Sequence, residues 1–184
     1  MSRIGRLPIV IPSGVKVEIK EDTVIVVGPK GELQQNITPG IKVELKENKI
    51  IVSRNDDERK TRALHGLIRS LLANMVQGVT KGFQKDLEVV GVGYRAQMAG
   101  SKIVLRAGYS HQVEVEPLTG TSLGVEGTNK IKVNGINKEI VGQMAANIRA
   151  IKPLDDFKGK GIKYAGEIVH LKAGKTGKAI GSKQ

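Results

Sequence analysis

Glycine and lysine alternate near the end of the chain, in the run Phe157-Lys158-Gly159-Lys160-Gly161-Ile162-Lys163-Tyr164. Glycine has no side chain, so such a backbone can approach a phosphate ribbon closely while successive ammonium groups lie on both sides of it. The rings of Phe157 and Tyr164, at the two ends of the run, could stack on an exposed base or sugar. A flexible, solvated basic loop is the alternative interpretation. The composition of the chain favours contact with RNA.

Two other glycine motifs resemble nucleotide-binding loops in spacing alone. Gly91-Val92-Gly93-Tyr94-Arg95-Ala96 has the spacing of a dinucleotide fingerprint, which requires a helix directly after the glycines. Residues 87–98 instead alternate like one strand, so we predict that the two glycines leave a strand face bare for another backbone. Gly174-Lys175-Thr176 resembles the end of a phosphate-binding loop, but Val169 stands where that motif needs its first glycine. We therefore predict no nucleotide cofactor.

No group of side chains has the spacing of a catalytic or metal site. The chain has no cysteine, and its three histidines are far apart in the sequence. Ser110 and His111 are neighbours on an expected strand, where their side chains would face opposite sides and could not form a nucleophile–base pair. We expect His65 on the polar face of a helix, near Arg62 and Arg69. The sequence therefore predicts neither an enzyme, nor a metal site, nor a small-molecule substrate.

The chain is strongly basic. Its 184 residues include 30 lysines and arginines against 18 aspartates and glutamates, which gives a net charge of +12 and a pI near 9.9. Such an excess indicates a polyanionic partner, either nucleic acid or an anionic membrane surface. A membrane-surface module would need a basic amphipathic helix with bulky apolar anchors, whereas the lysines gather in a helix-poor segment. With no apolar run of spanning length and no signal segment, we predict a soluble cytoplasmic protein.

Aromatic residues are scarce, with two phenylalanines and three tyrosines in the whole chain. Proteins that read single-stranded RNA stack its bases on clustered aromatic side chains. The sequence shows no such cluster. We therefore predict that backbone charge and RNA shape are recognised, rather than base sequence.

Two kinds of hydrophobic periodicity predict the elements that hold these residues in place. From Val15 to Val52, apolar residues alternate between short polar turns, which predicts antiparallel hairpins. A helix is then predicted, with candidate caps at residues 55–57 and an end at Gly78. Its apolar face, at spacings of three and four, contains Leu64, Leu67, Ile68, Leu71, Leu72, Met75, Val76 and Val79.

The same order of elements begins again after Gly82. Residues 129–133 repeat the pattern of residues 48–52 at an offset of 81, and Arg149 follows Arg69 at an offset of 80. A second helix is predicted from the apolar residues Ile140, Val141, Met144, Ala145 and Ile148. The steady offset predicts an α+β fold of two tandem similar domains, residues 1–81 and 82–152, each an antiparallel β-sheet assembly packed on one α-helix.

A basic extension, residues 153–184, follows the second domain. Together with Lys152 it holds eight lysines and three acidic residues, which give a net charge of +5. Residues 173–183 have almost nothing to bury, so we expect them to be disordered without a partner.

Several motifs, in order from Met1 to about Lys178, resemble the ribosomal protein six family of the large ribosomal subunit. The motifs are Met1-Ser2-Arg3-Ile4-Gly5, Gly28-Pro29-Lys30-Gly31-Glu32-Leu33, Arg62-Ala63-Leu64-His65-Gly66, Gly91-Val92-Gly93-Tyr94-Arg95-Ala96, Gly108-Tyr109-Ser110-His111 and Lys158-Gly159-Lys160-Gly161-Ile162-Lys163-Tyr164. One stretch departs from the family. Leu154-Asp155-Asp156-Phe157 replaces the usual Pro-Glu-Pro-Tyr, which loosens the approach to the lysines, adds a repulsive carboxylate and removes a hydroxyl.

The resemblance implies a structural protein bound to large-subunit, 23S-type rRNA. It places the protein near the base of the stalk that recruits translation factors and near the factor-binding RNA loop. The second domain and the extension would make most of the RNA contacts, and neighbouring large-subunit proteins would be further partners. The location implied is the ribosome of the cytoplasm, or of an organelle interior if an organelle encodes the chain.

The residues expected on rRNA are the basic, glycine and aromatic residues at and after the end of the second repeat: Arg149, Lys152, Phe157, Lys158, Gly159, Lys160, Gly161, Lys163, Tyr164, Lys172, Lys175 and Lys178. Weaker candidates are Arg3, Arg6, Arg69, Arg95 and His111. RNA affinity should fall steeply with salt, and deletion of residues 152–184 should remove most of it.

Overall fold

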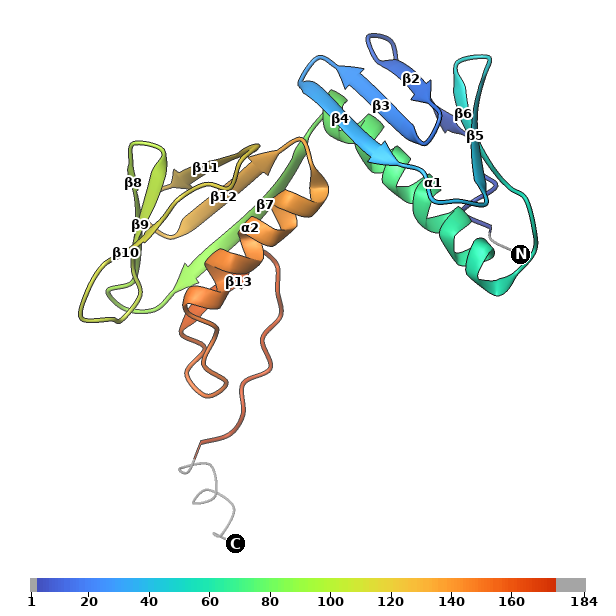
Figure 1. Cartoon of the computed structure of the whole chain (residues 1–184). Helices are drawn as coiled ribbons and strands as arrows, with labels where there is room; N and C mark the ends of the chain where they lie inside the picture. Colours follow the sequence, from blue (N-terminus) through green and yellow to red (C-terminus); the bar gives the residue numbers. More distant parts are fainter. Residues whose placement is uncertain (1–2, 175–184) are drawn as a thin grey trace, which may run out of the picture. The chain divides into compact units, whose positions relative to one another are not determined.

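The computed structural model describes residues 3–174, which fall into two compact units (Figure 1). Unit 1 contains the chain up to Phe83 together with Gly135–Lys138. Unit 2 contains Gln84–Asn134 and the chain from Glu139 onward. The predicted limits of the three segments, after residues 81 and 152, stay a prediction. No helix among residues 3–174 is both long enough and apolar enough to cross a bilayer.

Unit 1 packs one helix, α1, against two antiparallel three-stranded sheets. The sheets have the strand orders β2-β3-β4 and β1-β6-β5. The elements are β1 (Ile9–Val10), β2 (Lys16–Lys20), β3 (Thr23–Gly28), β4 (Gly31–Asn36), β5 (Ile41–Lys46), β6 (Lys49–Arg54) and α1 (Arg59–Thr80). Alternation decides which side chains are buried, because successive residues of a strand face opposite sides. Val24 and Val26 of β3 and Ile50 and Val52 of β6 thus enter the core beside α1.

The helix α1 is longer than predicted, because Gly78 does not end it. Gly78 lies inside the helix, where a Cβ atom would overlap the carbonyl oxygen of Ile136. Glycine is therefore needed there for close packing. The helix ends two residues later, at Thr80. Gly82 then adopts a φ of 79° and its amide donates to the carbonyl of Gln77 (3.2 Å). On the apolar face, Leu67 departs from the prediction and is 51% exposed.

The predicted cap also differs. Glu58 is the N-cap residue of α1 and its side chain makes no capping hydrogen bond. Of the three candidates, the carboxylate of Asp56 accepts a hydrogen bond from the amide of Glu58 (3.0 Å), directly before the first helical residue. Asp57 instead pairs with the guanidinium of Arg54, and this hydrogen bond lowers the pKa of Asp57.

His65 is buried, contrary to the prediction of a polar helix face. It is 3% exposed, and its Nε2 lies 2.9 Å from the carbonyl oxygen of Val52. Its Nδ1 lies 3.1 Å from the guanidinium of Arg54. Because arginine can only donate, Nδ1 accepts and Nε2 carries the proton. Strand β6 supplies both partners, so tertiary hydrogen bonds hold a polar ring inside the core.

Replacement of Gly5 by alanine should destabilise unit 1. A Cβ at Gly5 would lie 2.5 Å from Nδ1 of His65, and the ring cannot move without breaking its two hydrogen bonds. We expect the free energy of unfolding of Gly5→Ala to fall by about 1–3 kcal/mol in a denaturant titration. Gly142→Ala is the matched control, because nothing lies within 4 Å of that Cβ position. Equal stability of the two variants would contradict the packing argument.

Unit 2 repeats the architecture of unit 1. Its sheets have the strand orders β10-β9-β8 and β11-β12-β7-β13. The elements are β7 (Phe83–Val90), β8 (Arg95–Ala99), β9 (Lys102–Arg106), β10 (Val113–Val115), β11 (Thr121–Glu126), β12 (Lys130–Gly135), α2 (Lys138–Ile151) and β13 (Gly161–Tyr164). Strands β7 to β12 correspond in order to β1 to β6, and α2 corresponds to α1. The predicted α+β duplication is confirmed.

Four of the five residues predicted for the apolar face of α2 are buried, and the fifth, Ile140, is half-buried. The buried residues are Val141, Met144, Ala145 and Ile148. Within the same unit, Ile131 and Val133 of β12 are fully buried. The corresponding residues of β6, Ile50 and Val52, are 0% and 5% exposed. These matching burial patterns are the structural counterpart of the 81-residue offset in the sequence.

Strand β13 comes from the extension and adds a fourth strand to the second sheet. It pairs antiparallel with β7, with Ile162 opposite Val89 and Lys163 opposite Glu88. Ile162 is fully buried. This part of the extension is therefore integrated in the core of unit 2, rather than a flexible loop.

The Gly91–Ala96 motif contains a break that the sequence did not predict. Strand β7 ends at Val90, a turn follows, and β8 begins at Arg95, so residues 87–98 are not one strand. The amide of Tyr94 donates to the carbonyl of Gly91 (3.2 Å). A Cβ at Gly91 would lie 2.9 Å from the ring of Tyr94. The glycine thus makes room for a side chain, not for another backbone.

Candidate nucleic-acid interface

The first half of the glycine–lysine run forms a tight turn between α2 and β13, and its second half is β13 itself. The amide of Lys158 donates to the side-chain carboxylate of Asp155 (2.9 Å), and the amide of Gly159 donates to its carbonyl (2.9 Å). The amide of Asp155 donates in turn to the carbonyl of Lys160 (2.9 Å). Asp155, part of the stretch that departs from the family, thus organises the turn. Phe157, at the tip of this turn, is 57% exposed.

The two glycines of the run have intramolecular roles. Gly159 adopts a φ of 65° and Gly161 a φ of 148°, both in the region that side chains rarely occupy. A Cβ at Gly161 would lie 2.6 Å from the carbonyl oxygen of Pro153. Packing within unit 2 therefore explains Gly161. Close approach of these glycines to a phosphate stays a prediction.

Several predicted RNA-binding cations are engaged in ion pairs inside unit 2. Lys163 pairs with Glu88 (3.2 Å), its neighbour across the β7–β13 ladder. Arg149 pairs with Glu167 (2.6 Å), and its guanidinium lies 5.2 Å from the ring centroid of Tyr164. The first pair joins β13 to β7, and the contacts of Arg149 join the end of α2 to β13 and to the residues that follow it.

Glu167 also fixes the backbone of β13. Its second carboxylate oxygen accepts a hydrogen bond from the amide of Tyr164 (2.9 Å). The Nε atom of Arg149 is buried and makes no hydrogen bond within residues 3–174. Arg149 therefore mainly holds β13 against the end of α2. It does so through its contact with the ring of Tyr164, while Glu167 neutralises part of its charge.

The chain after β13 returns to the turn. The ammonium group of Lys172 donates to the carboxylate of Asp156 (2.6 Å), and its amide donates to the carbonyl of Asp156 (2.9 Å). The hydrogen bond with Asp156 raises the pKa of Lys172. Asp156 thus binds a lysine of the extension, where the sequence predicted only a repulsive charge. Lys175 and Lys178 lie outside the described residues.

Lys158 and Lys160 are the cations of the turn without a carboxylate partner. Lys158 is exposed and Lys160 is half-buried. Within residues 3–174, neither ammonium group lies within ion-pair distance of an acidic side chain. Lys152 is close by, because its carbonyl accepts from the amide of Ile162 (2.8 Å). These three lysines are available for phosphates.

A loop between β9 and β10 is tied to the same end of α2. The hydroxyl of Tyr109 donates to the carbonyl of Ile151 (2.7 Å), and the ammonium group of Lys152 lies 4.8 Å from the tyrosine ring centroid. The ring of His111 stacks on Tyr109 with centroids 5.8 Å apart. Ser110 and His111 therefore lie in a loop, not on the predicted strand.

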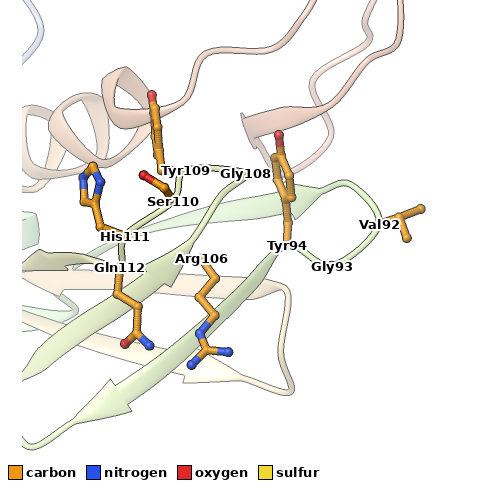
Figure 2. Close-up of a pocket in the computed structure, with 9 residues that line it drawn as sticks. All are labelled: Val92, Gly93, Tyr94, Arg106, Gly108, Tyr109, Ser110, His111 and Gln112. Carbon is orange, nitrogen blue, oxygen red and sulfur yellow. The ribbon is translucent and has the colours of Figure 1, made fainter.

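An open pocket lies between this loop and the turn after β7 (Figure 2). Tyr94 rises from one side, Tyr109 and His111 from the other, and the guanidinium of Arg106 extends beneath them. Two of the five aromatic residues thus meet at one pocket, although the sequence showed no cluster. They are 15 positions apart in the sequence, and only the pairing of β8 with β9 brings them together.

The weaker candidates are dispersed. Arg95 at the start of β8 is exposed, and so are Arg3 and Arg6 in unit 1. Arg69 is half-buried, and its Nε atom donates to the carbonyl of Leu7 (3.1 Å), so it anchors the N-terminal segment to α1. Among the described residues, no group of three histidine, aspartate or glutamate side chains could hold a metal ion.

Comparison with known proteins adds the family. The model of a family described as Ribosomal protein L6 matches residues 11–82 and 90–165, one segment in each repeat. The chain belongs to the ribosomal protein L6 family. It is 59% identical over 178 residues to a protein of Geobacillus stearothermophilus, covering 97% of this chain and 100% of the relative.

Two further relatives in the L6 family cover almost the whole chain. A Thermoanaerobacter protein is 55% identical over 179 residues, covering 97% of this chain and 99% of the relative. A Thermomicrobium roseum protein is 52% identical over 184 residues, covering all of both. All three relatives are named large ribosomal subunit protein uL6. The predicted family resemblance is confirmed.

Proposed function

We propose that this chain is a structural constituent of the large ribosomal subunit and binds large-subunit, 23S-type rRNA through unit 2. Membership of a ribosomal-protein family supports the ribosomal role. The observation that carries the RNA assignment is the pair Lys158 and Lys160 at the turn before β13, which form no ion pair with a carboxylate among residues 3–174, in a chain with a net charge of +12. A surface of this kind attracts the phosphate backbone and releases its counterions.

Lys152, Lys158 and Lys160 neutralise phosphates in this proposal. The turn is held from inside by Asp155, so Lys158 and Lys160 start from a defined backbone. A preorganised surface loses less conformational entropy on binding than a flexible loop does. The exposed ring of Phe157, which directly precedes Lys158 in the sequence, can cover a base or ribose.

The paired cations support this surface. Arg149 and Lys163 keep the end of α2 and β13 in place through Glu167 and Glu88. Lys172 differs, because its pair with Asp156 is exposed to solvent on both sides. An exposed ion pair contributes little to stability, so a phosphate can take the place of Asp156 when the extension binds RNA.

The pocket beside Tyr94 and Tyr109 gives the proposed interface a second contact. Arg106 and His111 provide hydrogen-bond donors there, and the two tyrosines provide apolar faces. Such a pocket suits a base or ribose that projects from folded RNA. It lies next to Lys152, through the contact of that lysine with Tyr109.

The remaining parts of the proposal follow the family resemblance. The binding site is near the base of the factor-recruiting stalk and the factor-binding RNA loop, with neighbouring large-subunit proteins as further partners. The protein acts without enzymatic activity and supports subunit assembly and translation. It resides in ribosomes of the cytoplasm, or of an organelle interior if an organelle encodes it.

Sedimentation of ribosomal subunits tests this function directly. The tagged chain should co-sediment with large subunits and leave them only in a high-salt wash, because phosphate contacts weaken as salt rises. Small subunits from the same gradient are the control. Recovery of the chain in the small-subunit or ribosome-free fractions at low salt would contradict the proposal.

A further inference from the structure

The two units differ at the outer edge of one sheet. In unit 2, the outer edge of β7 is occupied by β13 (Figure 1). In unit 1, the corresponding strand is β1, and no strand among the described residues pairs with its outer edge. An open strand edge can add a strand from another molecule, which is a common route to aggregation. In unit 1, the outer edge of β1 could therefore pair with a strand of another molecule unless something prevents it.

Hydrogen bonds fix which residues of β1 and β7 correspond. The amide of Ile11 donates to the carbonyl of Asn48 (3.0 Å), and the amide of Val89 donates to the carbonyl of Asn129 (2.7 Å). Asn48 and Asn129 are the repeat partners found in the sequence, at an offset of 81. Ile11 therefore corresponds to Val89. Counting back and forward along the strands matches Pro8 with Asp86, Val10 with Glu88, and Pro12 with Val90.

The backbone groups of Asp86, Glu88 and Val90 face β13. The amide of Ala165 donates to the carbonyl of Asp86 (2.9 Å), and the ladder continues with Lys163 opposite Glu88. In an antiparallel ladder, only every second residue of a strand bonds to a given neighbour. Asp86, Glu88 and Val90 are therefore the three positions at which β7 accepts the fourth strand.

Two of the three corresponding positions in unit 1 are proline. Pro8 and Pro12 flank Val10 on the outward-facing side of β1. Proline has no amide hydrogen, and its ring occupies the space where a neighbouring strand would lie. An added strand would therefore find one amide donor, that of Val10, where β7 offers amides at all three positions.

The edge of β1 is also apolar. The side chains of Leu7 and Val10 are 56% and 64% exposed. Exposed apolar residues on an unpaired edge favour pairing with a like edge of another molecule. Neither residue carries a charge that would oppose such pairing.

We propose that Pro8 and Pro12 close the outer edge of β1 against edge-to-edge pairing with a second copy of this chain. Of the two corresponding edges, those of β1 and β7, only the edge of β7 then accepts a strand, and the chain fills it with its own residues 161–164. The proposal is independent of RNA binding. It explains why an edge that is completed by a strand in unit 2 has no added strand from residues 3–174 in unit 1.

Restoring the amides tests the proposal in the full chain. In sedimentation velocity, Pro8→Thr/Pro12→Thr should shift from one toward two monomer masses as concentration rises, whereas the parent chain stays at one. Pro39→Thr, an exposed proline of the same unit outside the strands, is the matched control and should stay monomeric. Adding Val10→Lys to the double variant should restore the monomer, because an edge charge opposes pairing.

Amide exchange of Ile11 shows whether β1 is intact in each variant, since that amide bonds to Asn48. A monomeric double variant with a protected Ile11 amide would overturn the proposal. If the double variant does not fold, the single variants Pro8→Thr and Pro12→Thr are compared in the same way. Two folded single variants that both remain monomeric at every concentration would also overturn it.

Discussion

Removing the charges of Lys158 and Lys160 should weaken binding to protein-free large-subunit rRNA by about 10- to 100-fold at moderate salt, on the order of 1–3 kcal/mol. These two lysines have no carboxylate partner within the described residues, so their charge is available to phosphates. The double variant Lys158→Ala/Lys160→Ala should also show a salt dependence whose slope is smaller by roughly 1.5, because two phosphate contacts are lost. Filter binding across a salt series measures both quantities.

Lys16→Ala/Lys20→Ala is the matched control for this variant. It removes the same charge from exposed positions of β2 in unit 1. A general effect of net charge would weaken both variants equally, whereas a defined interface on unit 2 would affect the first far more. Equal affinities and equal salt slopes would therefore contradict the assignment of the interface. Denaturant unfolding of both variants should be unchanged, since surface lysines contribute little to stability.

The duplicated fold was predictable because hydrophobic alternation directly encodes which strand face is buried. Ile50 and Val52 occupy alternate positions of β6, as Ile131 and Val133 do in β12, and all four enter a core. The offset between the copies needed only the order of residues along the chain. The hydrophobic pattern of a strand can be read from the sequence without knowledge of its tertiary contacts.

The errors arose where a tertiary contact overrides the local pattern. His65 looks polar in the sequence of α1, but Val52 and Arg54 of β6 satisfy both ring nitrogens and bury it. Gly78 looks like a helix end, but it makes room for the carbonyl of Ile136, 58 positions later. Neither partner can be identified from residues within one helical turn.

The candidate interface was predictable in composition but not in pairing. The basic run is evident in the sequence, but the neutralisation of Lys163 by Glu88 depends on the register of two strands 75 positions apart. The same register changes the meaning of the deletion of residues 152–184. Because that deletion also removes β13, loss of RNA binding by the truncated chain would not distinguish missing lysines from a damaged core.

A single substitution in β13 should separate stability from charge. Ile162 is fully buried, and its replacement by alanine leaves a cavity beneath the lysine-bearing turn. We expect Ile162→Ala to lower the free energy of unfolding by about 2–4 kcal/mol in denaturant titration. Ile168→Ala is the matched control, because that side chain is 82% exposed in the same extension and should change stability by less than about 0.5 kcal/mol.

The same variant should show where the turn is held. The amides of Glu88 and Val90 face β13, so their hydrogen exchange should accelerate in Ile162→Ala if the strand detaches from β7. RNA affinity should fall together with this protection although no charge has been removed, because Lys158 and Lys160 lose their fixed backbone. If RNA affinity stayed unchanged while β13 detached, the lysines would act as a flexible charged segment, and the preorganised surface would be the part of the proposal to abandon.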